Sequence, residues 1–237
     1  YANPDCHPGV EQAPAFRDLV ERRVAGEPIA YLTGVREFWS MPLKITPDVL
    51  IPRPETELLV ETALEIIPKT AAWRVADLGT GSGAIALALA IERPNCEVHA
   101  TEYSEEALRL AMENGRAIAP GRVRFHQGSW LEPLKGRFEV LVSNPPYVAA
   151  NDPHLKQGDC RFEPADALTP GRDALAAIRH IADESRRYLE PRGTLAFEHG
   201  FDQGPALRQL LCEMGYCGVE TIQDLEKRDR VTLGTYG

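Results

Sequence analysis

From residue 74 onward, short apolar runs alternate with longer stretches of helical periodicity, and this alternation leaves few folds open to the chain. We expect strands at 74–78, 97–101, 123–126, 138–142, 194–198, 218–222 and 230–234. We expect helices at 84–92, 104–119, 172–188 and 203–214. This order predicts an α/β fold with a mainly parallel sheet covered by helices on both faces. The last two strands follow each other closely enough to form an antiparallel hairpin.

The sequence before residue 74 predicts a smaller unit that precedes the α/β domain. Apolar residues recur at helical spacing from Phe16 to Val24, which indicates one short amphipathic helix, and Gly26 and Pro28 end it. Residues 37–51 hold aromatic and β-branched residues interrupted by prolines, so we expect an irregular hairpin there. A second helix is expected over 54–67.

Composition excludes several classes of protein and substrate. Apolar residues make up 43% of the 237 residues, which is typical of a globular domain. The 26 basic and 35 acidic residues give a net charge of −9, which disfavours nucleic acid as the direct substrate. The longest apolar run, 84–91, has eight residues, far from the roughly 20 that span a membrane. Five cysteines without a Cys-x-x-Cys pattern indicate free thiols in the cytoplasm and no metal site.

A glycine-rich loop follows the first of the expected strands. Residues 77–83 read Asp-Leu-Gly-Thr-Gly-Ser-Gly and lead into an almost wholly apolar helix, as expected for a helix packed against a sheet. The glycines let a ligand approach the backbone closely, and the helix N-terminus offers free N–H donors. A tight turn without a ligand needs the same backbone freedom, so the loop alone leaves both interpretations open.

Two acidic residues narrow the class of ligand. The loop is Gly-x-Gly-x-Gly, unlike the dinucleotide fingerprint Gly-x-Gly-x-x-Gly, and Asp77 would repel a pyrophosphate. Glu102 ends the next strand, 19 residues after Gly83, where a carboxylate can accept both hydroxyls of a ribose. Glu102 could equally be a solvated strand end before a Ser104 helix cap. Together the two acids and three glycines predict a ligand with a ribose, an amino group and no phosphate, which is S-adenosylmethionine.

A proline-rich turn, Ser-Asn-Pro-Pro-Tyr at 143–147, follows the strand at 138–142. Two consecutive prolines hold the backbone stiff and extended. The carboxyl ends of parallel strands are where open α/β sheets bind ligands, so we expect this turn to lie at the same edge as the glycine loop. The alternative is an ordinary loop whose tyrosine packs into the core.

Such a turn can activate a planar nitrogen for methyl transfer. The lone pair of an amide or aromatic amino nitrogen is delocalised, so a catalyst must align it with the methyl donor and polarise its hydrogens. The side-chain carbonyl of Asn144 and the backbone carbonyl of Pro145 can accept two N–H groups, and Tyr147 offers a flat face for stacking. We therefore predict catalytic roles for Asn144, Pro145 and Tyr147, and substrate binding by 144–147, Pro146 included.

Both motifs together resemble those of class I S-adenosylmethionine-dependent methyltransferases that modify planar nitrogens. Flanking segments at 26–34, 51–57, 161–164 and 230–234 further resemble the bacterial release-factor glutamine methyltransferases of the HemK/PrmC type. The resemblance implies a Rossmann-like, mostly parallel seven-stranded sheet with a terminal antiparallel hairpin over 73–237. It also implies a hairpin and helix connector over 31–72, and a remnant of a helical N-terminal recognition domain over 1–30.

In that family the methyl group goes to the side-chain amide nitrogen (N5) of the glutamine in the Gly-Gly-Gln motif of class I peptide-chain release factors, which would be the protein partner. S-adenosylhomocysteine would be the product. Carried over by position, the resemblance implies that the cofactor is bound by Asp77, Gly79, Thr80, Gly81, Ser82, Gly83, Glu102, Trp130 and Asn144. Trp130 would flank the adenine, although an aromatic residue considered alone is more often part of the core. Glu102 stands where aspartate is more usual in the family.

Other interpretations stay open at this point. The same chemistry would suit a glutamine of a ribosomal protein, or an exocyclic amino group of a flipped adenine or guanine in nucleic acid. A non-catalytic cofactor-binding protein would not need Asn144. Residues 148–171 are long for a structureless connection and are expected to form a lid or substrate-binding loop, and Arg53 could position the connector or be a surface cation.

Overall fold

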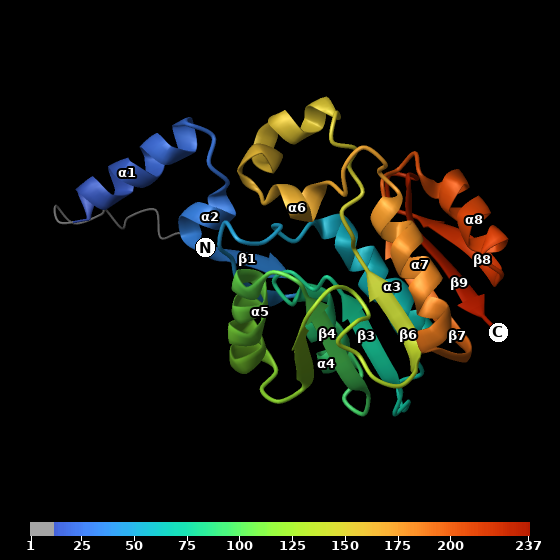
Figure 1. Ribbon diagram of the computed structural model, residues 1–237. Coiled ribbons are helices and arrows are strands. Elements are labelled where there is room, and N and C mark those ends of the chain that lie inside the picture. Colours follow the sequence, from blue (N-terminus) through green and yellow to red (C-terminus); the bar gives the residue numbers. More distant parts are fainter. Residues whose placement is uncertain (1–11) are drawn as a thin grey trace.

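The computed structural model describes residues 12–237 and confirms the α/β class (Figure 1). Seven strands form the central sheet in the order β5-β4-β3-β6-β7-β9-β8. The first five of this order are parallel, whereas β9 pairs antiparallel with both β7 and β8. The strands are β3 (Arg74–Leu78), β4 (Glu97–Glu102), β5 (Val123–Gln127), β6 (Phe138–Ser143), β7 (Leu189–Glu198), β8 (Tyr216–Gln223) and β9 (Asp229–Tyr236).

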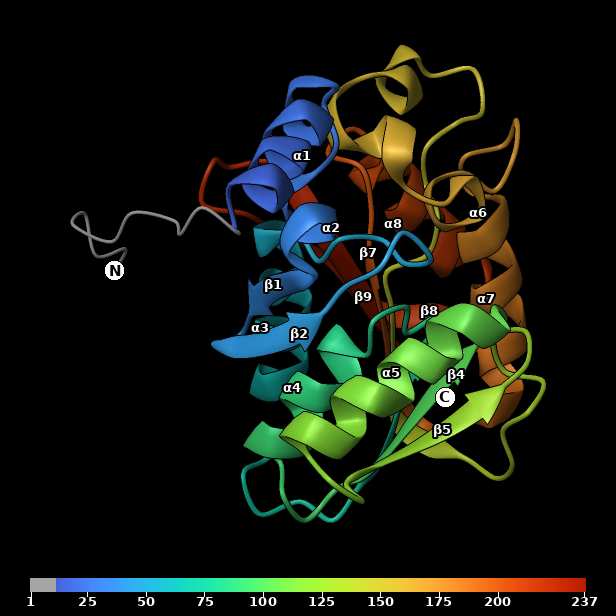
Figure 2. The same cartoon turned by 90° about the vertical axis from the view of Figure 1, so that its left-hand side faces the viewer.

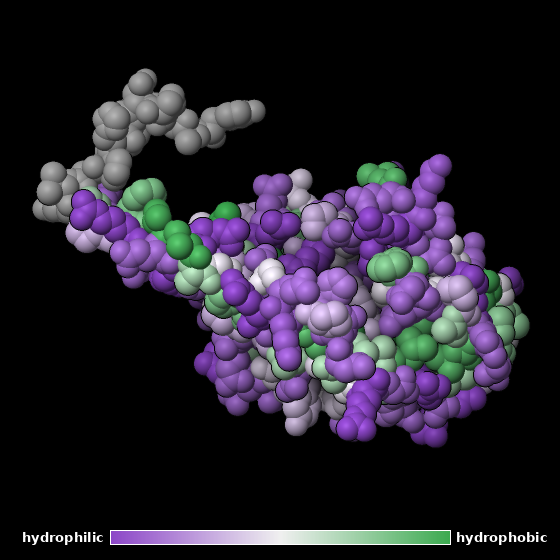
Figure 3. Space-filling model, turned by 90° about the horizontal axis from the view of Figure 1, so that it is seen from above, coloured by the Kyte–Doolittle hydropathy of each residue, from purple (hydrophilic) through white to green (hydrophobic). Residues whose placement is uncertain are grey.

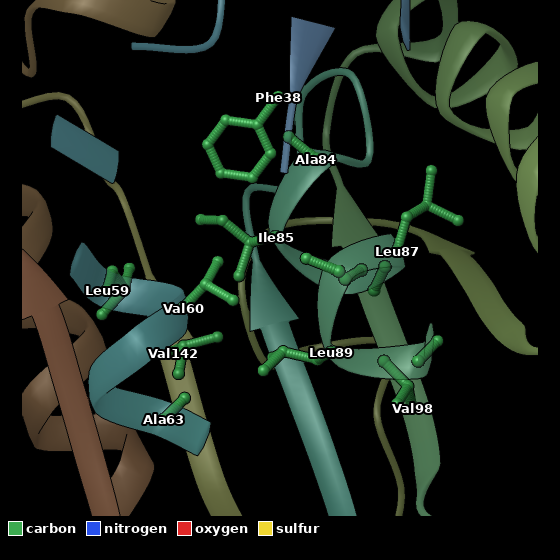
Figure 4. Packing of buried hydrophobic residues seen from close by; sticks show 14 of the residues in the cluster. Phe38, Leu59, Val60, Ala63, Ala84, Ile85, Leu87, Leu89, Val98 and Val142 are labelled. Atoms are coloured by element: carbon green, nitrogen blue, oxygen red, sulfur yellow. The ribbon is translucent and has the colours of Figure 1, made fainter. Parts of the chain in front are cut away.

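Helices cover both faces of the sheet because successive strand residues point to opposite sides. On one face α3 (Glu57–Ile66), α4 (Ala84–Glu92) and α5 (Glu105–Ile118) pack with one set of strand residues. On the other face α7 (Ala176–Tyr188) and α8 (Gly204–Glu213) pack with the alternate set. Figure 4 shows the first of these cores, in which Leu59 and Val60 of α3 and Ile85 of α4 lie close to Val142 of β6. Residues Ala84 to Ala90 of α4 are all buried, as its apolar sequence predicts.

The connector forms a hairpin that differs in position from the prediction. After α2 (Ile29–Thr33), the strands β1 (Val35–Phe38) and β2 (Met41–Lys44) pair antiparallel. The hairpin thus begins two residues before the predicted range of 37–51 and ends seven residues before the end of that range. Trp39 and Ser40 make the turn with positive φ angles of 51° and 57°, which is the backbone of a tight hairpin turn. The hairpin lies beside α5 (Figure 2). A short 3-10 turn, η1 (Pro54–Thr56), then leads into α3.

The first helix, α1 (Ala13–Val24), projects from the rest of the molecule (Figure 1) and contains no buried residue. Its apolar residues Phe16, Val20 and Val24 are exposed, and Figure 3 shows apolar surface along this projecting arm. The recognition-domain remnant predicted for 1–30 lies partly outside the described residues, which begin at 12.

Residues 148–171, for which we expect a lid or substrate-binding loop, fold into short helices. These are η2 (Pro153–Lys156), η3 (Gly158–Phe162) and α6 (Ala165–Leu168). The next helix, α7, begins at Ala176 and not at 172, because the side chain of Asp173 accepts from the backbone N–H of Leu175 and starts a turn that leads into the helix. Within residues 12–237, no helix has the length and apolar character needed to cross a membrane.

Candidate active site

The glycine loop and the proline-rich turn leave adjacent parallel strands at the same edge of the sheet. Asp77 of β3 lies opposite Val142 of β6, so the two segments start side by side. The buried Ser143 hydroxyl donates to the backbone carbonyl of Leu78 at 2.6 Å and ties the two strand ends together. The strands that follow β3 lie first on one side of it (β4 and β5) and then on the other (β6 and β7), so the strand order switches between β3 and β6. Open α/β sheets bind their ligands at such a switch point. The expectation that both motifs share one edge is confirmed.

The glycine loop depends on backbone conformations that glycine adopts freely. Gly79, Gly81 and Gly83 have φ angles of 75°, 56° and 89°, all in the left-handed region. The backbone N–H groups of Gly79 and Thr80 donate to the carbonyl of Thr101 at 3.0 and 2.9 Å, which fixes the loop against β4. The loop is therefore held in one shape before any ligand binds.

Asp77 supports this loop from behind and does not line the cavity. Its side chain is 0% exposed, and its Oδ2 accepts from the Thr80 hydroxyl at 2.5 Å and from the Ala86 N–H at 3.2 Å. Its Oδ1 is buried without a hydrogen-bond partner among the described residues. Burial raises the pKa of this carboxyl to about 7, with Thr80 and Ala86 opposing the rise and Glu102 adding to it.

Glu102 holds the tip of the loop. Its Oε2 accepts from the Gly81 N–H at 2.9 Å and its Oε1 from the Ser104 N–H at 3.0 Å. A carboxylate has about four lone-pair positions, so each oxygen keeps one for a further donor such as a ribose hydroxyl. Glu102 stands just before a helix capped by Ser104, and it also lines the cavity, where its contact with a ribose stays a prediction.

Trp130 packs on the glycine loop. Its backbone has a φ of 44°, and its ring stands 2.8 Å from the point that a Cβ on Gly79 would occupy. Because the ring also lines the cavity, its packing role and its proposed contact with a ligand are compatible.

A cavity of about 860 Å³ opens between the loop and the turn. This volume lies within the range of small-molecule sites. Of the residues predicted from the sequence, the wall contains Gly79, Thr80, Gly81, Ser82, Glu102, Trp130, Asn144 and Pro146, whereas Asp77, Gly83, Pro145 and Tyr147 do not line it. The wall also includes residues that the sequence did not single out as site residues, namely Asp48, Pro52 and Thr56 from the connector, and Tyr103. Pro164 and Asp166 line it from the 148–171 segment, which the sequence predicted to be a lid or substrate-binding loop. No group of three or more His, Cys, Asp or Glu side chains in residues 12–237 is arranged to hold a metal ion.

The proline-rich turn is held at both ends by side chains. The Asn144 Nδ2 donates to the Thr56 hydroxyl oxygen at 3.3 Å, and the Tyr147 hydroxyl donates to Oε1 of Glu198 at 3.2 Å. The Gln203 side chain donates to the Tyr147 carbonyl at 2.9 Å. Sequence reasoning missed Glu198, although an acidic residue at the carboxyl end of an apolar strand was the signal that could have found it.

The connector and the 148–171 segment are joined by a buried ion pair. Arg53 Nη2 lies 2.5 Å from Oε2 of Glu163, whose side chain is 0% exposed, and Glu163 Oε1 accepts from the Ile51 N–H at 2.9 Å. Burial raises the pKa of Glu163, with Arg53 as the main opposing influence. Arg53 thus positions the connector and is not a free surface cation.

Comparisons with known proteins agree with this geometry. The family model described as methyltransferase small domain matches residues 54–175, and the one described as PrmC N-terminal domain matches 1–34. A relative from Salmonella typhimurium, named release factor glutamine methyltransferase, is 51% identical over 95% of this chain and 81% of its own length. A relative of the same name from Escherichia coli K12 is 50% identical over 95% of this chain and 82% of its own.

Solved structures share the fold at low sequence identity. A methyltransferase from Pyrococcus furiosus superposes with a TM-score of 0.62 at 19% identity, covering 94% of this chain and 100% of that one. A Thermus thermophilus 16S rRNA N2 G1207 methyltransferase, solved with AdoMet and guanosine, gives a TM-score of 0.63 at 18% identity, covering 86% and 50%.

Proposed function

Because this chain belongs to the release factor glutamine methyltransferases, we propose that its Asn144–Tyr147 turn holds the acceptor amide while the loop at 79–83 holds the methyl donor. The protein is an S-adenosylmethionine-dependent enzyme that methylates the side-chain amide of a glutamine in a release factor. We place that glutamine in the Gly-Gly-Gln motif of class I factors. Since release factors act in translation, we expect the enzyme to work in the cytoplasm.

The residues around the cavity suit S-adenosylmethionine. Bound there, it supplies a methyl group made electrophilic by the sulfonium charge. Glu102 keeps one lone pair on each carboxylate oxygen for the ribose hydroxyls, and Trp130 offers an aromatic face in the wall. Gly79 and Gly81 let the donor approach the backbone without a side chain in the way. Asp77 acts through the loop, which it braces by its bonds to Thr80 and Ala86.

The turn would orient the glutamine amide. Asn144 lines the cavity, so its side-chain carbonyl can accept one N–H of the amide. Pro145 is not itself part of the wall but stands between the wall residues Asn144 and Pro146, and we propose that its backbone carbonyl accepts the other N–H. Pro146 forms part of the same wall, and Tyr147, the last residue of the turn, is held by the bond from its hydroxyl to Glu198. Two acceptors fix the nitrogen in line with the donor and increase its electron density. The proton can leave after methyl transfer, when the alkylated nitrogen has become acidic, so the reaction needs no strong base.

The observation that carries this proposal is that Asn144 and the glycine loop line one cavity from adjacent strand ends. The test supplies labelled methyl donor with a release factor, the same factor with its motif glutamine changed to alanine, a structured RNA, and ribosomal proteins in parallel. We expect label only on the intact factor. Label on RNA would favour the exocyclic amino group of a base as acceptor, and label on a ribosomal protein alone would favour that substrate.

The role of Asn144 is tested by Asn144→Ala. We expect donor binding measured by calorimetry to stay nearly constant while methyl transfer falls at least about 100-fold, as when one transition-state partner is removed. Turnover close to that of the unchanged enzyme would refute the assignment.

We further propose that residues 1–30 belong to a substrate-recognition domain, with 31–72 as the connector to a catalytic domain over 73–237. The match of the PrmC N-terminal domain model to residues 1–34 and the exposed apolar residues of α1 support the first of these boundaries.

A further inference from the structure

Gln203 joins two segments of the backbone beside the proposed active site, and the mechanism above does not use it. It lies just before α8, but within residues 12–237 its side chain makes no capping hydrogen bond to that helix. Instead its Oε1 accepts from the Gly200 N–H at 2.9 Å, and its Nε2 donates to the Tyr147 carbonyl at 2.9 Å. A backbone N–H can only donate and a backbone carbonyl can only accept, so these two partners leave the amide a single orientation.

The loop that carries Gln203 is anchored to the sheet by its neighbour His199. The backbone N–H of His199, whose side chain is buried, donates to the Arg230 carbonyl of β9 at 3.0 Å. Its ring nitrogens bind the Thr232 hydroxyl at 2.7 Å and the Gly200 carbonyl at 2.8 Å. A Cβ on Gly200 would stand 3.2 Å from Gln203 Oε1, so glycine lets the amide fold back closely onto the loop. Gln203 therefore acts from a fixed support.

The carbonyl that Gln203 binds belongs to a peptide group that is held from both sides. The Val148 N–H lies in the same peptide plane and donates to the Leu168 carbonyl of α6 at 3.0 Å. The Tyr147–Val148 peptide is thus fixed between the loop before α8 and the short helix α6. Without the bond from Gln203, this plane could rotate about the bond that remains.

The orientation of this peptide bears on the Pro145 carbonyl, which the proposed mechanism directs at the substrate amide. The rings of Pro145 and Pro146 fix φ at both positions, and peptide bonds are planar, so the turn has less freedom than an ordinary loop. Tyr147 is restricted further because its hydroxyl is bound to Glu198. A rotation of the peptide after Tyr147 would therefore shift the Pro145 carbonyl, and a misplacement of about 1 Å at a reacting centre can cost about 100-fold in rate.

We propose that Gln203 is a positioning residue, whose amide fixes the Tyr147–Val148 peptide and so keeps the Pro145 carbonyl directed at the substrate amide. The inference rests on the proposed function of the 144–147 turn. It adds that the turn depends on a side chain remote from the reacting atoms, since neither Gln203 nor Tyr147 is among the described residues of the cavity wall.

The test uses pH, so the ionisable groups of the surrounding elements matter. The loop, β9 and α6 place such side chains around this region, namely Glu198, His199, Asp202, Asp229, Arg230 and Asp166. Burial raises the pKa of Glu198 to about 6 and lowers the pKa of His199. Because these groups titrate in the unchanged enzyme as well as in a variant, the quantity to compare is the ratio of the two rates at each pH.

The variants are Gln203→Glu and Gln203→Met. Q203E keeps an oxygen for the Gly200 N–H, but its ionised carboxyl has no hydrogen for the Tyr147 carbonyl, whereas its protonated form regains one. Q203M has a side chain of similar size that can never donate. At pH 8 we expect kcat to fall about 10- to 100-fold in both variants. Donor affinity measured by calorimetry should stay within about twofold, because the wall of the cavity is unchanged.

The pH dependence distinguishes a positioning bond from a merely structural contact. As pH falls from 8 to 5, the rate of Q203E relative to the unchanged enzyme should rise at least about fivefold, because the protonated fraction of a carboxyl increases steeply over this range. The corresponding ratio for Q203M should stay constant. Gln209→Glu is the matched control, since Gln209 is an exposed residue of α8 whose amide bonds to Glu213. Its rate ratio should stay near one at every pH.

Unchanged kcat in both Gln203 variants, or a Q203E ratio as flat as that of Q203M, would overturn the proposal. A loss in Q209E as large as that in Q203E would also overturn it, because added charge on this part of the chain would then explain the effect. If circular dichroism shows that Q203M does not fold, the Q203E ratio decides alone, since it follows one variant across pH. If Asn144→Ala keeps full turnover, the proposed function itself has failed; if Asn144→Ala loses turnover while both Gln203 variants keep it, the positioning role alone has failed.

Discussion

Replacing Gly79 with alanine tests whether the glycine loop and Trp130 are packed as closely as the structure indicates. A Cβ on Gly79 would lie 2.8 Å from Cζ3 of Trp130, where ordinary contacts begin near 3.4 Å. The ring would have to move by roughly 0.5 to 1 Å, and such overpacking costs about 1–3 kcal/mol. The left-handed φ of 75° adds roughly 1–2 kcal/mol for any residue with a Cβ. We therefore expect the free energy of unfolding to fall by about 2–5 kcal/mol.

Gly81→Ala is the matched control for this change. Gly81 has a φ of 56°, but nothing lies within 4 Å of its Cβ position, so only the conformational cost of roughly 1–2 kcal/mol applies. Urea unfolding without ligand, followed by circular dichroism, gives both values. The difference between the two variants isolates the contact with Trp130.

A third variant separates the ring from the loop. In a Trp130→Ala background the contact is gone, so Gly79→Ala should then cost no more than Gly81→Ala. If Gly79→Ala and Gly81→Ala are equally stable in the unchanged background, or if removing Trp130 brings no relief, the argument for close packing is refuted.

For three further substitutions, charge and burial determine the direction of the effect on stability or on ligand binding. Burial raises the pKa of folded Asp77 to about 7, roughly 3 above its ordinary value, so keeping this side chain ionised in the folded protein costs at most about 4 kcal/mol. As pH rises from 4 to 8, the free energy of unfolding of the unchanged protein should therefore fall relative to that of Asp77→Asn. A difference between the two that stays constant with pH would contradict this. Arg53→Met leaves Glu163 buried and unpaired, so we expect a loss of about 3 kcal/mol at pH 8 that shrinks toward pH 5 as Glu163 takes up a proton; a pH-independent loss would argue against it. Glu102→Ala should weaken S-adenosylmethionine binding in calorimetry by about tenfold or more, because the loop loses its partner at Gly81 and the ribose its acceptor; unchanged affinity would remove Glu102 from the site.

The sequence predicted those parts of the fold that local patterns decide. The burial of the whole of α4 follows from its lack of polar residues, and the shared edge of the two motifs follows from the geometry of parallel strands. The predicted ends of a helix or strand were less accurate where tertiary contacts extend that element. β7 begins at Leu189, five residues before the predicted start, because Phe138 of β6 pairs with Leu189 across an irregularity in the ladder.

The candidate site was predicted only where a motif is contiguous in sequence. Thr56 and Glu198 lie far from residue 144 along the chain, and only the assembled sheet brings them to the two ends of the turn. Asn114 is a similar case, since its buried amide joins the backbone of Lys44 to that of Ser82 and so links the connector to the glycine loop. No local spacing marks such residues, because their partners are set by the packing of separate elements.

The position of β9 has a consequence for how this molecule is made. Because β9 follows β8 in sequence yet lies between β7 and β8 in the sheet, β7 has an open edge and β8 has no neighbouring strand until residues 229–236 have been synthesised. An unpaired strand edge invites association with other chains. A growing polypeptide would therefore expose the unpaired edge of β7 until β9 pairs with both β7 and β8. A delay in the synthesis of residues 229–236 would prolong this exposure and favour aggregation.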